Sequence, residues 1–334
     1  MKKRPTIHTV AEAAGVSVST VSRVINGSAR VDAAKVKMVQ DAVERLGYRP
    51  DTVARDLSSK KSAIIGLNGG GSNLLNPYSI LFREMFHAKL QDHHLRLEHT
   101  PSVQGQLPEY MGDIAVLMEL QENDTRIAQC NKNKLPFVVI GHAEGERGVA
   151  PNDFDGGRQA AKHLVELGHS AFLFLGNSVD ENAIWSSASH NEFVQQRLRG
   201  FISQLRLADI TLDDSRIINS GPSSLDAFLA IRDVIRKGVT FTAIFAISDE
   251  LAVGAIKALE DAGLTVPQDV SVIGFDDFMG AGQNLTTVHQ EIGEVADAAA
   301  TLVKEALAGE PIRHIEIPVR LIIRASTAEA KKPS

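Results

Sequence analysis

Residues 62–327 alternate short apolar runs with longer segments of helical periodicity, and this alternation constrains the fold more than any other feature. The runs predict strands at 63–67, 114–120, 136–141, 171–176, 216–219, 243–246 and 270–275. The longer segments predict helices near 80–92, 156–167, 192–205, 225–237, 249–262 and 293–307. Alternating strands and helices build parallel sheets covered by helices. Because this stretch is about twice an ordinary domain in length, we predict an α/β body of two doubly wound lobes.

The first 49 residues follow a different pattern, which predicts three short helices near 7–14, 18–25 and 33–46. Thr6, Ser17 and Asp32 are suited to cap their N-termini, and Gly15 to end the first. The apolar side chains expected to pack this head are Val10, Ala11, Val16, Val21, Val24, Val36, Val39, Val43 and Leu46. Two helices joined by a tight turn with glycine are typical of a helix-turn-helix, whose second helix enters the DNA major groove.

The charge of the chain is unevenly distributed. Residues 1–61 contain twelve Lys and Arg against six Asp and Glu, whereas the remainder contains 23 against 35, and the whole chain carries −6. A basic head on an acidic body is expected when only the head meets phosphate. The alternative is a solvated basic terminus that binds nothing.

The second predicted helix carries side chains suited to DNA. Ser19, Thr20 and Ser22 can bond bases or phosphates, Arg23 suits the major-groove edge of guanine, and Val18 can touch a thymine methyl group. The same serine and threonine content is also expected of a polar face in contact with solvent.

The head resembles the lactose-repressor/galactose-repressor family of bacterial transcription regulators. The similarity rests on TIHTVAEAAGVSVSTVSRVING at 6–27 and VERLGYRP at 43–50. The resemblance implies that Val18, Ser19 and Arg23 read bases. It also implies that backbone phosphates are held by Thr6, Thr20, Ser22, Asn26 and Tyr48.

Residues 50–61 link the head to the body. A single short helix after Asp51 would not persist alone in water, because helix nucleation is costly. The resemblance implies that paired hinge helices of a dimer lie in the minor groove, where Leu57 inserts between base steps and Ala54 permits close approach. The alternative is a flexible linker whose Leu57 packs on the body.

Polar residues follow several predicted strands of the body, where ligands of doubly wound sheets bind. Ser248 and Asp249 follow one strand, Asp276 follows another, and Asp155 precedes a predicted helix. Carboxylates together with Arg197 suit bidentate hydrogen bonds to the hydroxyls of a polar ligand. The alternative is that the three aspartates are helix N-caps and that Arg197 is a surface charge.

The body resembles the effector domain of the same family, whose fold is related to that of periplasmic sugar-binding proteins. The likeness runs to about residue 327 and rests on NPY at 76–78, NDFDGG at 152–157, SD at 248–249 and FDD at 275–277. It implies a small-molecule effector, of carbohydrate type, bound between the lobes by Tyr78, Asp155, Arg197, Ser248 and Asp276. Trp185, in a polar loop at 180–191, could line the same pocket as a platform for ring stacking. For Tyr78 and Trp185, packing in the interior is the alternative role.

These patterns predict a helix-turn-helix domain at 1–49, a hinge at 50–61, an effector-binding and dimerisation domain at 62–327 and a tail at 328–334. The function expected from the resemblance is sequence-specific transcription regulation, as a repressor. A homodimer in the cytoplasm would bind double-stranded, pseudo-palindromic operator DNA, because a two-fold dimer meets a two-fold site.

Other classes of function lack their motifs in this sequence. The triple glycine at 69–71 is not followed by Gly-Lys-Ser/Thr, the histidines show no zinc spacing with the lone Cys130, and no nucleophile elbow occurs. We therefore expect no cofactor, no metal and no enzymatic activity. Long apolar runs are missing, so neither a membrane span nor an export signal is expected. A solute-binding protein would share the body but not the head.

Overall fold

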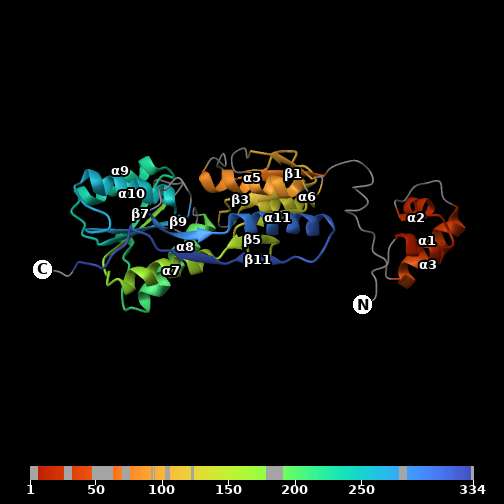
Figure 1. Cartoon of the computed structure of the whole chain (residues 1–334). Coiled ribbons are helices and arrows are strands. Elements are labelled where there is room, and N and C mark those ends of the chain that lie inside the picture. Colours follow the sequence, from red (N-terminus) through yellow and green to blue (C-terminus); the bar gives the residue numbers. More distant parts are fainter. Residues whose placement is uncertain are drawn as a thin grey trace. The chain divides into compact units, whose positions relative to one another are not determined.

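The computed structural model describes residues 7–25, 32–46, 63–69, 76–91, 93, 95–101, 106–121, 124–177, 191–277 and 284–331. The chain forms two compact units, Met1–Ser62 and Ala63–Ser334 (Figure 1). We call the first unit the head and the second unit the body.

The head contains three helices, α1 (Ile7–Ala14), α2 (Val18–Ile25) and α3 (Ala33–Leu46), as the sequence predicts. Their shared core consists of Val10, Ala11, Ala14, Val21, Val39 and Ala42. Two predicted caps are in place. The Thr20 amide donates to Ser17 Oγ at 3.2 Å, and the Ala34 amide donates to Asp32 Oδ1 at 2.8 Å. Gly15 takes the left-handed conformation, with φ of +64°, that ends α1.

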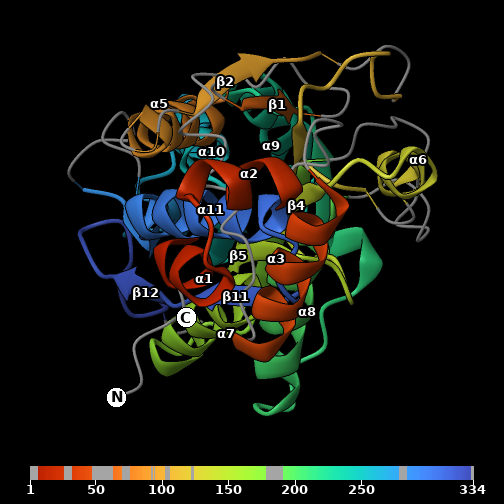
Figure 2. The same ribbon diagram turned by 90° about the vertical axis from the view of Figure 1, so that its right-hand side faces the viewer.

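Residues 63–151, together with the segments Ile292–Leu307 and His314–Ile317 from the C-terminal part of the chain, form one lobe, which we call lobe N, around a six-stranded parallel sheet. Its strands, in spatial order, are β11 (His314–Ile317), β5 (Gly148–Pro151), β4 (Phe137–Ile140), β3 (Ile114–Met118), β1 (Ile64–Asn68) and β2 (Arg96–His99). Helices α5 (Pro77–Gln91) and α11 (Ile292–Leu307) cover one face. Helix α6 (Thr125–Asn133) covers the other face (Figure 2).

The second lobe, lobe C, contains another six-stranded sheet. Its strands, in order, are β12 (Val319–Ile322), β10 (Thr286–Gln290), β9 (Ser271–Asp276), β8 (Ala243–Ala246), β6 (Phe172–Asn177) and β7 (Ile217–Ser220). All neighbours are parallel except β12, which runs antiparallel to β10. Helices α7 (Asp153–Glu166) and α8 (Glu192–Arg206) lie on one side, and α9 (Ser224–Arg236) and α10 (Asp249–Asp261) on the other (Figure 1). A short 3₁₀ helix, Asp214–Arg216, precedes β7. The prediction of two doubly wound lobes is confirmed.

The chain crosses between the lobes three times, near residues 151–153, 290–292 and 317–319. The chain leaves lobe N at the carboxyl ends of β5 and β11, and it leaves lobe C at the carboxyl end of β10. Because the strands beside them are parallel, the carboxyl ends of both sheets meet at the boundary between the lobes. Doubly wound folds bind their ligands at this end of a sheet.

Several elements escaped the sequence analysis, namely β2, β5, β10, β11, β12 and α6. Strands β2 and β11 lie partly exposed and mix polar with apolar residues, so they lack an apolar run. Strand β5 is buried but contains glycine and proline, which favour turns when read from sequence. Helix α7 begins at Asp153, before the predicted start at Gly156, because Asn152 caps it by accepting the Asp155 amide at 2.8 Å.

Residues 328–331, which the sequence sets apart as a tail, bind to lobe C. The Ala330 amide donates to the Leu167 carbonyl oxygen at 2.8 Å, and Lys331 lies 2.5 Å from Asp269. These backbone and ionic contacts make this segment part of the lobe. Among the described helices of the chain, none is long and apolar enough to cross a membrane.

Candidate functional site

Two glycines bring α7 and α8 into close contact beside the lobe boundary. A Cβ atom on Gly200 would lie 1.9 Å from the Phe154 carbonyl oxygen, and one on Gly157 would lie 2.0 Å from the Arg197 carbonyl oxygen. Only a residue without a side chain fits at either position. The close approach places Arg197 of α8 against Asp153, the first residue of α7.

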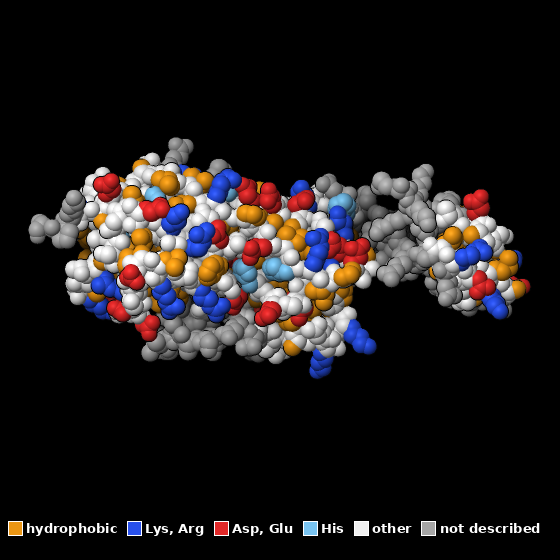
Figure 3. Space-filling view, turned by 90° about the horizontal axis from the view of Figure 1, so that it is seen from below, with side chains coloured by type: hydrophobic (Ala, Val, Ile, Leu, Met, Phe, Trp, Pro, Cys, Tyr) orange, Lys and Arg blue, Asp and Glu red, His pale blue; other side chains and the backbone are white. Residues whose placement is uncertain are grey.

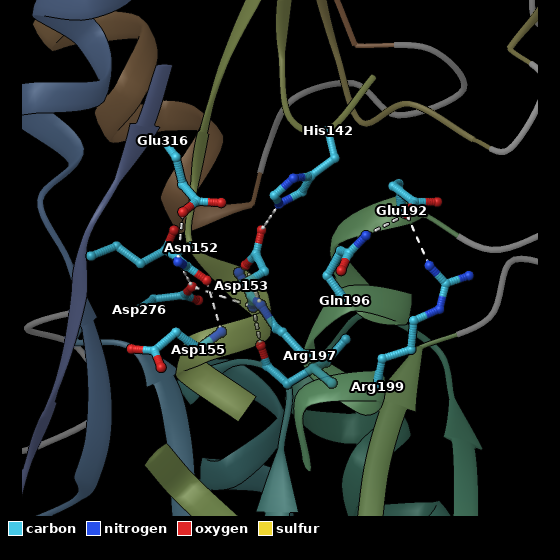
Figure 4. A network of polar contacts seen from close by, with 12 residues as sticks. His142, Asn152, Asp153, Asp155, Glu192, Gln196, Arg197, Arg199, Asp276 and Glu316 are labelled. Carbon is cyan, nitrogen blue, oxygen red and sulfur yellow. Dashed lines mark hydrogen bonds and ion pairs between the residues drawn. The ribbon is translucent and has the colours of Figure 1, made fainter. Parts of the chain in front are cut away.

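The Asp153 carboxylate joins side chains of both lobes (Figure 4). Arg197 Nε donates to Asp153 Oδ1 at 2.8 Å, and His142 Nε2 lies 3.0 Å from Asp153 Oδ2. His142 follows β4 in lobe N, whereas Arg197 belongs to lobe C. Asp153 and Arg197 are only 1% and 5% exposed. A buried carboxylate of this kind needs such partners to remain in the interior.

The Arg197 guanidinium is held on several sides. Its Nη1 donates to the Ile247 carbonyl oxygen and lies 3.8 Å from Asp276 Oδ1. The guanidinium carbon lies 3.5 Å from the centroid of the Phe275 ring, within the range of a cation–π contact. These contacts preorganise the guanidinium at the carboxyl end of the lobe C sheet.

Asp276 ends β9 in a strained backbone conformation. Its φ is +112° and that of Asp277 is +56°, values that non-glycine residues rarely adopt and that cluster at functional sites. Gln290 Nε2 donates to Asp276 Oδ1 at 2.6 Å. The buried Gln290 Oε1 has no hydrogen-bond partner among the described residues. A ligand that donates a hydrogen bond to Gln290 Oε1 would satisfy this buried acceptor, which lies next to the Asp276 carboxylate.

Burial raises the pKa of Asp276 to about 8, against the opposing effect of the Arg197 charge and with a further contribution from the negative charge of Asp249. Asp249 itself is buried, and its Oδ1 accepts from Thr287 Oγ1 at 2.6 Å. A Cβ atom on Gly274 would lie 2.2 Å from Asp249 Oδ1, so the carboxylate occupies the space left by a glycine. Asp153 and Asp276 thus both lie beside Arg197, and the charge of Asp249 acts on Asp276.

Lobe N also has polar residues near the boundary: Tyr78 lies in the first turn of α5, and Glu119 follows β3. Burial raises the pKa of Tyr78, and the charges of Asp153 and Asp276 raise it further. The Tyr78 ring also stacks on Phe82, with centroids 6.5 Å apart. Tyr78 therefore packs on the lobe N core, which was one of the two alternatives considered from sequence, and its contact with a ligand stays a prediction. Glu119 accepts from Asn76 Nδ2 at 2.8 Å.

A separate cavity of about 270 Å³ lies in lobe N, between α6, β4 and the C-terminal part of α11. Its lining is Cys130, Asn131, Lys134, Leu135, Pro136, Phe137, Glu146, Arg147, Ala306 and Ile312. We place the candidate site at the lobe boundary instead, because charged and polar groups of both lobes converge there, as in ligand sites of other proteins. Among the described residues no group of His, Cys, Asp and Glu is arranged to hold a metal ion.

Comparison with known proteins gives the same assignment to both units. Residues 6–51 match the bacterial regulatory proteins of the lacI family, and residues 161–327 match the periplasmic binding protein-like domain. The chain is 30% identical to the HTH-type transcriptional repressor PurR of Mannheimia succiniciproducens, over 96% of this chain and 98% of that protein. The chain belongs to the lacI family. It is a DNA-binding transcription regulator with a ligand-binding domain, as predicted.

Solved structures of lacI-family proteins share the fold. The lac repressor dimer bound to operator and the anti-inducer ONPF has a TM-score of 0.69 at 23% identity, covering 98% of this chain and 100% of that one. A lacI-family regulator of Enterococcus faecium with bound ribose has a TM-score of 0.67 at 26% identity, covering 80% of this chain and 100% of that one. The predicted fold class is confirmed.

The predicted effector residues are not all placed alike in this lacI-family body. Arg197 and Asp276 lie together at the lobe boundary, and the charges of both act on Tyr78. Ser248 caps α10, since its Oγ accepts the Leu251 amide at 3.3 Å. Asp155 accepts from Arg158 Nε at 2.8 Å and from Gln159 Nε2 at 2.7 Å. Trp185 lies outside the described residues.

Two alternatives from the sequence are wrong. Arg197 is not a surface charge, because it is buried. Asp155 and Asp249 are not N-caps, because Asn152 and Ser248 occupy those positions and the aspartates lie in the first helical turns. Ligand contact by any of these residues stays a prediction.

The predicted DNA-contacting residues of α2 divide by exposure. Ser19 and Arg23 are exposed, whereas Val18 is half-buried and packs against the core of the head. The hydroxyls of Ser19 and Thr20 lie 2.8 Å and 2.9 Å from Ser17 Oγ. The side chain of Ser22 and the whole of Thr6, Asn26, Tyr48, Ala54 and Leu57 lie outside the described residues.

Sequence reasoning missed Asp153, His142 and Gln290. Asp153 belongs to the NDFDGG run but was overlooked because the helix was expected to start later. His142 follows a predicted strand, so the rule that selected Ser248 and Asp276 could have found it. Gln290 ends β10, a strand that the apolar pattern did not reveal.

The raised pKa of Asp276 predicts a pH-dependent stability. A carboxyl group whose folded pKa exceeds its unfolded value of about 3.9 contributes stability that is lost as the pH rises through the folded pKa. Asp276→Asn, which is neutral at every pH, should therefore become more stable relative to the native chain between pH 5 and pH 8, by up to about 1 kcal/mol per pH unit. Urea unfolding at each pH measures the difference.

The control for this experiment is Asp261→Asn, an exposed position at the end of α10. Its stability relative to the native chain should not change over the same pH range. Parallel pH profiles for the native chain and Asp276→Asn would mean that Asp276 stays ionised throughout.

Proposed function

We propose that this lacI-family protein is a homodimeric cytoplasmic repressor of operator DNA whose affinity is controlled by a carbohydrate effector bound between lobe N and lobe C. The observation that carries the proposal is the convergence of Tyr78, Asp153, Arg197 and Asp276, from both lobes, at the carboxyl ends of two parallel sheets. Carboxylates that accept and an arginine that donates form the pattern that hydroxyl groups satisfy.

The ribose bound to the Enterococcus faecium regulator supports the choice of a carbohydrate. The face of Tyr78 or Trp185 would cover the apolar face of the sugar ring, while Arg197 and Asp276 bond its hydroxyls. Asp155 and Ser248 already have hydrogen-bond partners within the protein, so they would bind the sugar only by giving up those hydrogen bonds. A regulator rather than an enzyme is proposed, because the relatives are regulators.

In this proposal residues 1–49 read DNA, 50–61 form the hinge, and 62–327 bind effector and dimerise. Each head reads half of a pseudo-palindromic operator, and the exposed Ser19 and Arg23 contact base edges. Thr6, Thr20, Ser22, Asn26 and Tyr48 hold phosphates, while Leu57, with Ala54, enters the minor groove. Val18 is half-buried, so its part in base reading is limited to its exposed surface.

The three crossings between the lobes supply a hinge for control. An effector that bonds groups of both lobes changes the angle between them, and so the spacing of the two linkers of a dimer. The coupling is reciprocal, so operator DNA must change effector affinity by the same factor. A ligand with equal affinity for both arrangements would change nothing.

A thermal-shift screen of the full chain against sugars, sugar phosphates and purines tests the effector class. A sugar present at 100 times its Kd should stabilise the protein by about 2.7 kcal/mol. Asp276→Ala should lose that shift and keep operator binding. Binding of purines or sugar phosphates without any sugar would contradict the carbohydrate assignment.

Arg23→Ala tests the reading of DNA. Loss of a bidentate base contact should weaken binding to the specific site by about 1–3 kcal/mol and relax the preference at one base position. Gel shifts on genomic fragments, with a random-sequence fragment as the control, measure both effects. Equal weakening on all sequences would show that Arg23 contacts phosphate instead.

A further inference from the structure

The hydrogen bond between His142 and Asp153 joins the two lobes directly. His142 follows β4 in lobe N, and Asp153 is the first residue of α7 in lobe C. Figure 4 shows the imidazole pointing at the carboxylate, with Nε2 and Oδ2 3.0 Å apart. This bond can persist only while the ends of β4 and α7 stay together.

The same carboxylate orients Arg197. Asp153 Oδ2 faces His142 while Oδ1 accepts from Arg197 Nε at 2.8 Å, so the two contacts use different oxygens of one group. Rotation of the carboxylate away from His142 would therefore turn Oδ1 away from the guanidinium. A change at His142 in lobe N thus reaches the arginine of lobe C through one side chain.

We propose that His142 is a positioning residue of the effector site, which fixes Asp153 and through it Arg197 when the lobes are together, and does so most strongly as the protonated imidazolium. The inference rests on the proposed function, because Arg197 is taken to serve the effector pocket. Protons would then act with the effector in setting the arrangement of the lobes.

The groups around His142 favour its protonated form. Burial lowers the pKa of His142, but the hydrogen bond to Asp153 and the charges of Asp153, Glu192 and Glu316 together raise it above its ordinary value. The ring of His314, in β11, stacks on that of His142 with centroids 6.2 Å apart. The pKa of His314 is lowered by burial and by the charge of His142.

Histidine side chains also appear beside acidic ones near the middle of the body in Figure 3, where acidic and basic side chains are otherwise interspersed.

Because the folded pKa of His142 is raised, the stability that its protonated form contributes to the contact between the lobes is fully present below the unfolded value of about 6.5. The contribution is lost as the pH rises through the folded pKa. Mild acid should therefore hold the lobes together.

A backbone contact elsewhere on the boundary reports whether the lobes are together. The Glu192 amide at the start of α8 donates to the Leu120 carbonyl oxygen in lobe N at 3.2 Å. Gln121 and Asn191 form an antiparallel bridge beside it. Hydrogen exchange at the Glu192 amide therefore measures opening of the boundary without effector or operator.

The test compares exchange of the Glu192 amide in the full chain at pH 6 and pH 8, corrected for intrinsic rates, in the native protein, His142→Gln and His142→Ala. In the native protein the Glu192 amide should be several-fold better protected from exchange at pH 6 than at pH 8. His142→Gln retains an N–H donor but cannot bind a proton, so it should lose that pH difference. His142→Ala should be less protected at both pH values, by about tenfold at pH 6.

His87→Gln, an exposed position on α5, is the matched control and should behave as the native protein. The Val116 amide in the central strand β3 is the internal reference for global unfolding. A pH difference that persists in His142→Gln, unchanged protection in His142→Ala, or an unprotected Glu192 amide in the native protein would each overturn the proposal. Because no effector is used, such a failure is distinct from failure of the ligand screen.

Discussion

Gly200→Ala is expected to lower the free energy of unfolding by about 3 kcal/mol or more, because the new methyl group meets backbone rather than a movable side chain. Its carbon would lie 1.9 Å from the Phe154 carbonyl oxygen and 3.1 Å from the Arg158 amide nitrogen. No rotamer change can relieve that overlap. Helix α8 must move away from α7, and Arg197 moves with it.

Gly293→Ala in α11 is the matched control for this substitution. The nearest described heavy atom to its new Cβ is Met85 Sδ at 3.9 Å, an ordinary contact. Alanine is the better helix former, so this variant should be neutral or more stable by about 0.5–1 kcal/mol. Urea unfolding of both variants decides the matter. Native stability in Gly200→Ala would mean that α7 and α8 separate at little cost and do not hold Arg197 in place.

Arg197→Met should cost about 3–5 kcal/mol, because removing one partner leaves a buried charge without compensation. Asp153, 1% exposed, would lose its bond to Nε, and Asp276 would lose the cation 3.8 Å away. The Phe275 ring would keep an apolar neighbour of similar length. The variant should also lose any effector response while the head, a separate compact unit, still binds DNA.

Arg199→Met is the control on the same helix, since the Arg199 side chain is 60% exposed and lies 3.6 Å from Glu192. An exposed pair of this kind contributes less than about 1 kcal/mol. Combining Arg197→Met with Asp153→Leu should be less destabilising than Arg197→Met alone, because both charges leave the interior together. If the destabilisation of the double variant equals the sum of those of Arg197→Met and Asp153→Leu, Asp153 and Arg197 are not coupled.

The helices of the head illustrate what local sequence determines. Their bounds follow from caps within a few residues of each start, Ser17 and Asp32, and from glycine at the end of α1. Such interactions span at most one helical turn, so they can be recognised in the chain without knowledge of its tertiary neighbours.

The strands of the body show where this reasoning stops. Buried central strands such as β3 and β8 are continuous apolar runs and were predicted close to their true bounds. The crossing strands β11 and β12 are short and partly exposed, so their pairing depends on neighbours distant in the chain. A pattern of polarity within one segment does not contain that information.

The amino-acid sequence by itself determined the three-helix head, the α/β class of the body and the aspartates and arginine that could serve a ligand. The tertiary structure alone decided how those groups are used. It made Ser248 a cap, tied Asp155 to its own helix, and joined Asp153 to His142 across the lobes. The reason is physical: caps and periodicity act over a few residues, whereas the boundary is assembled by three crossings that bring distant segments together.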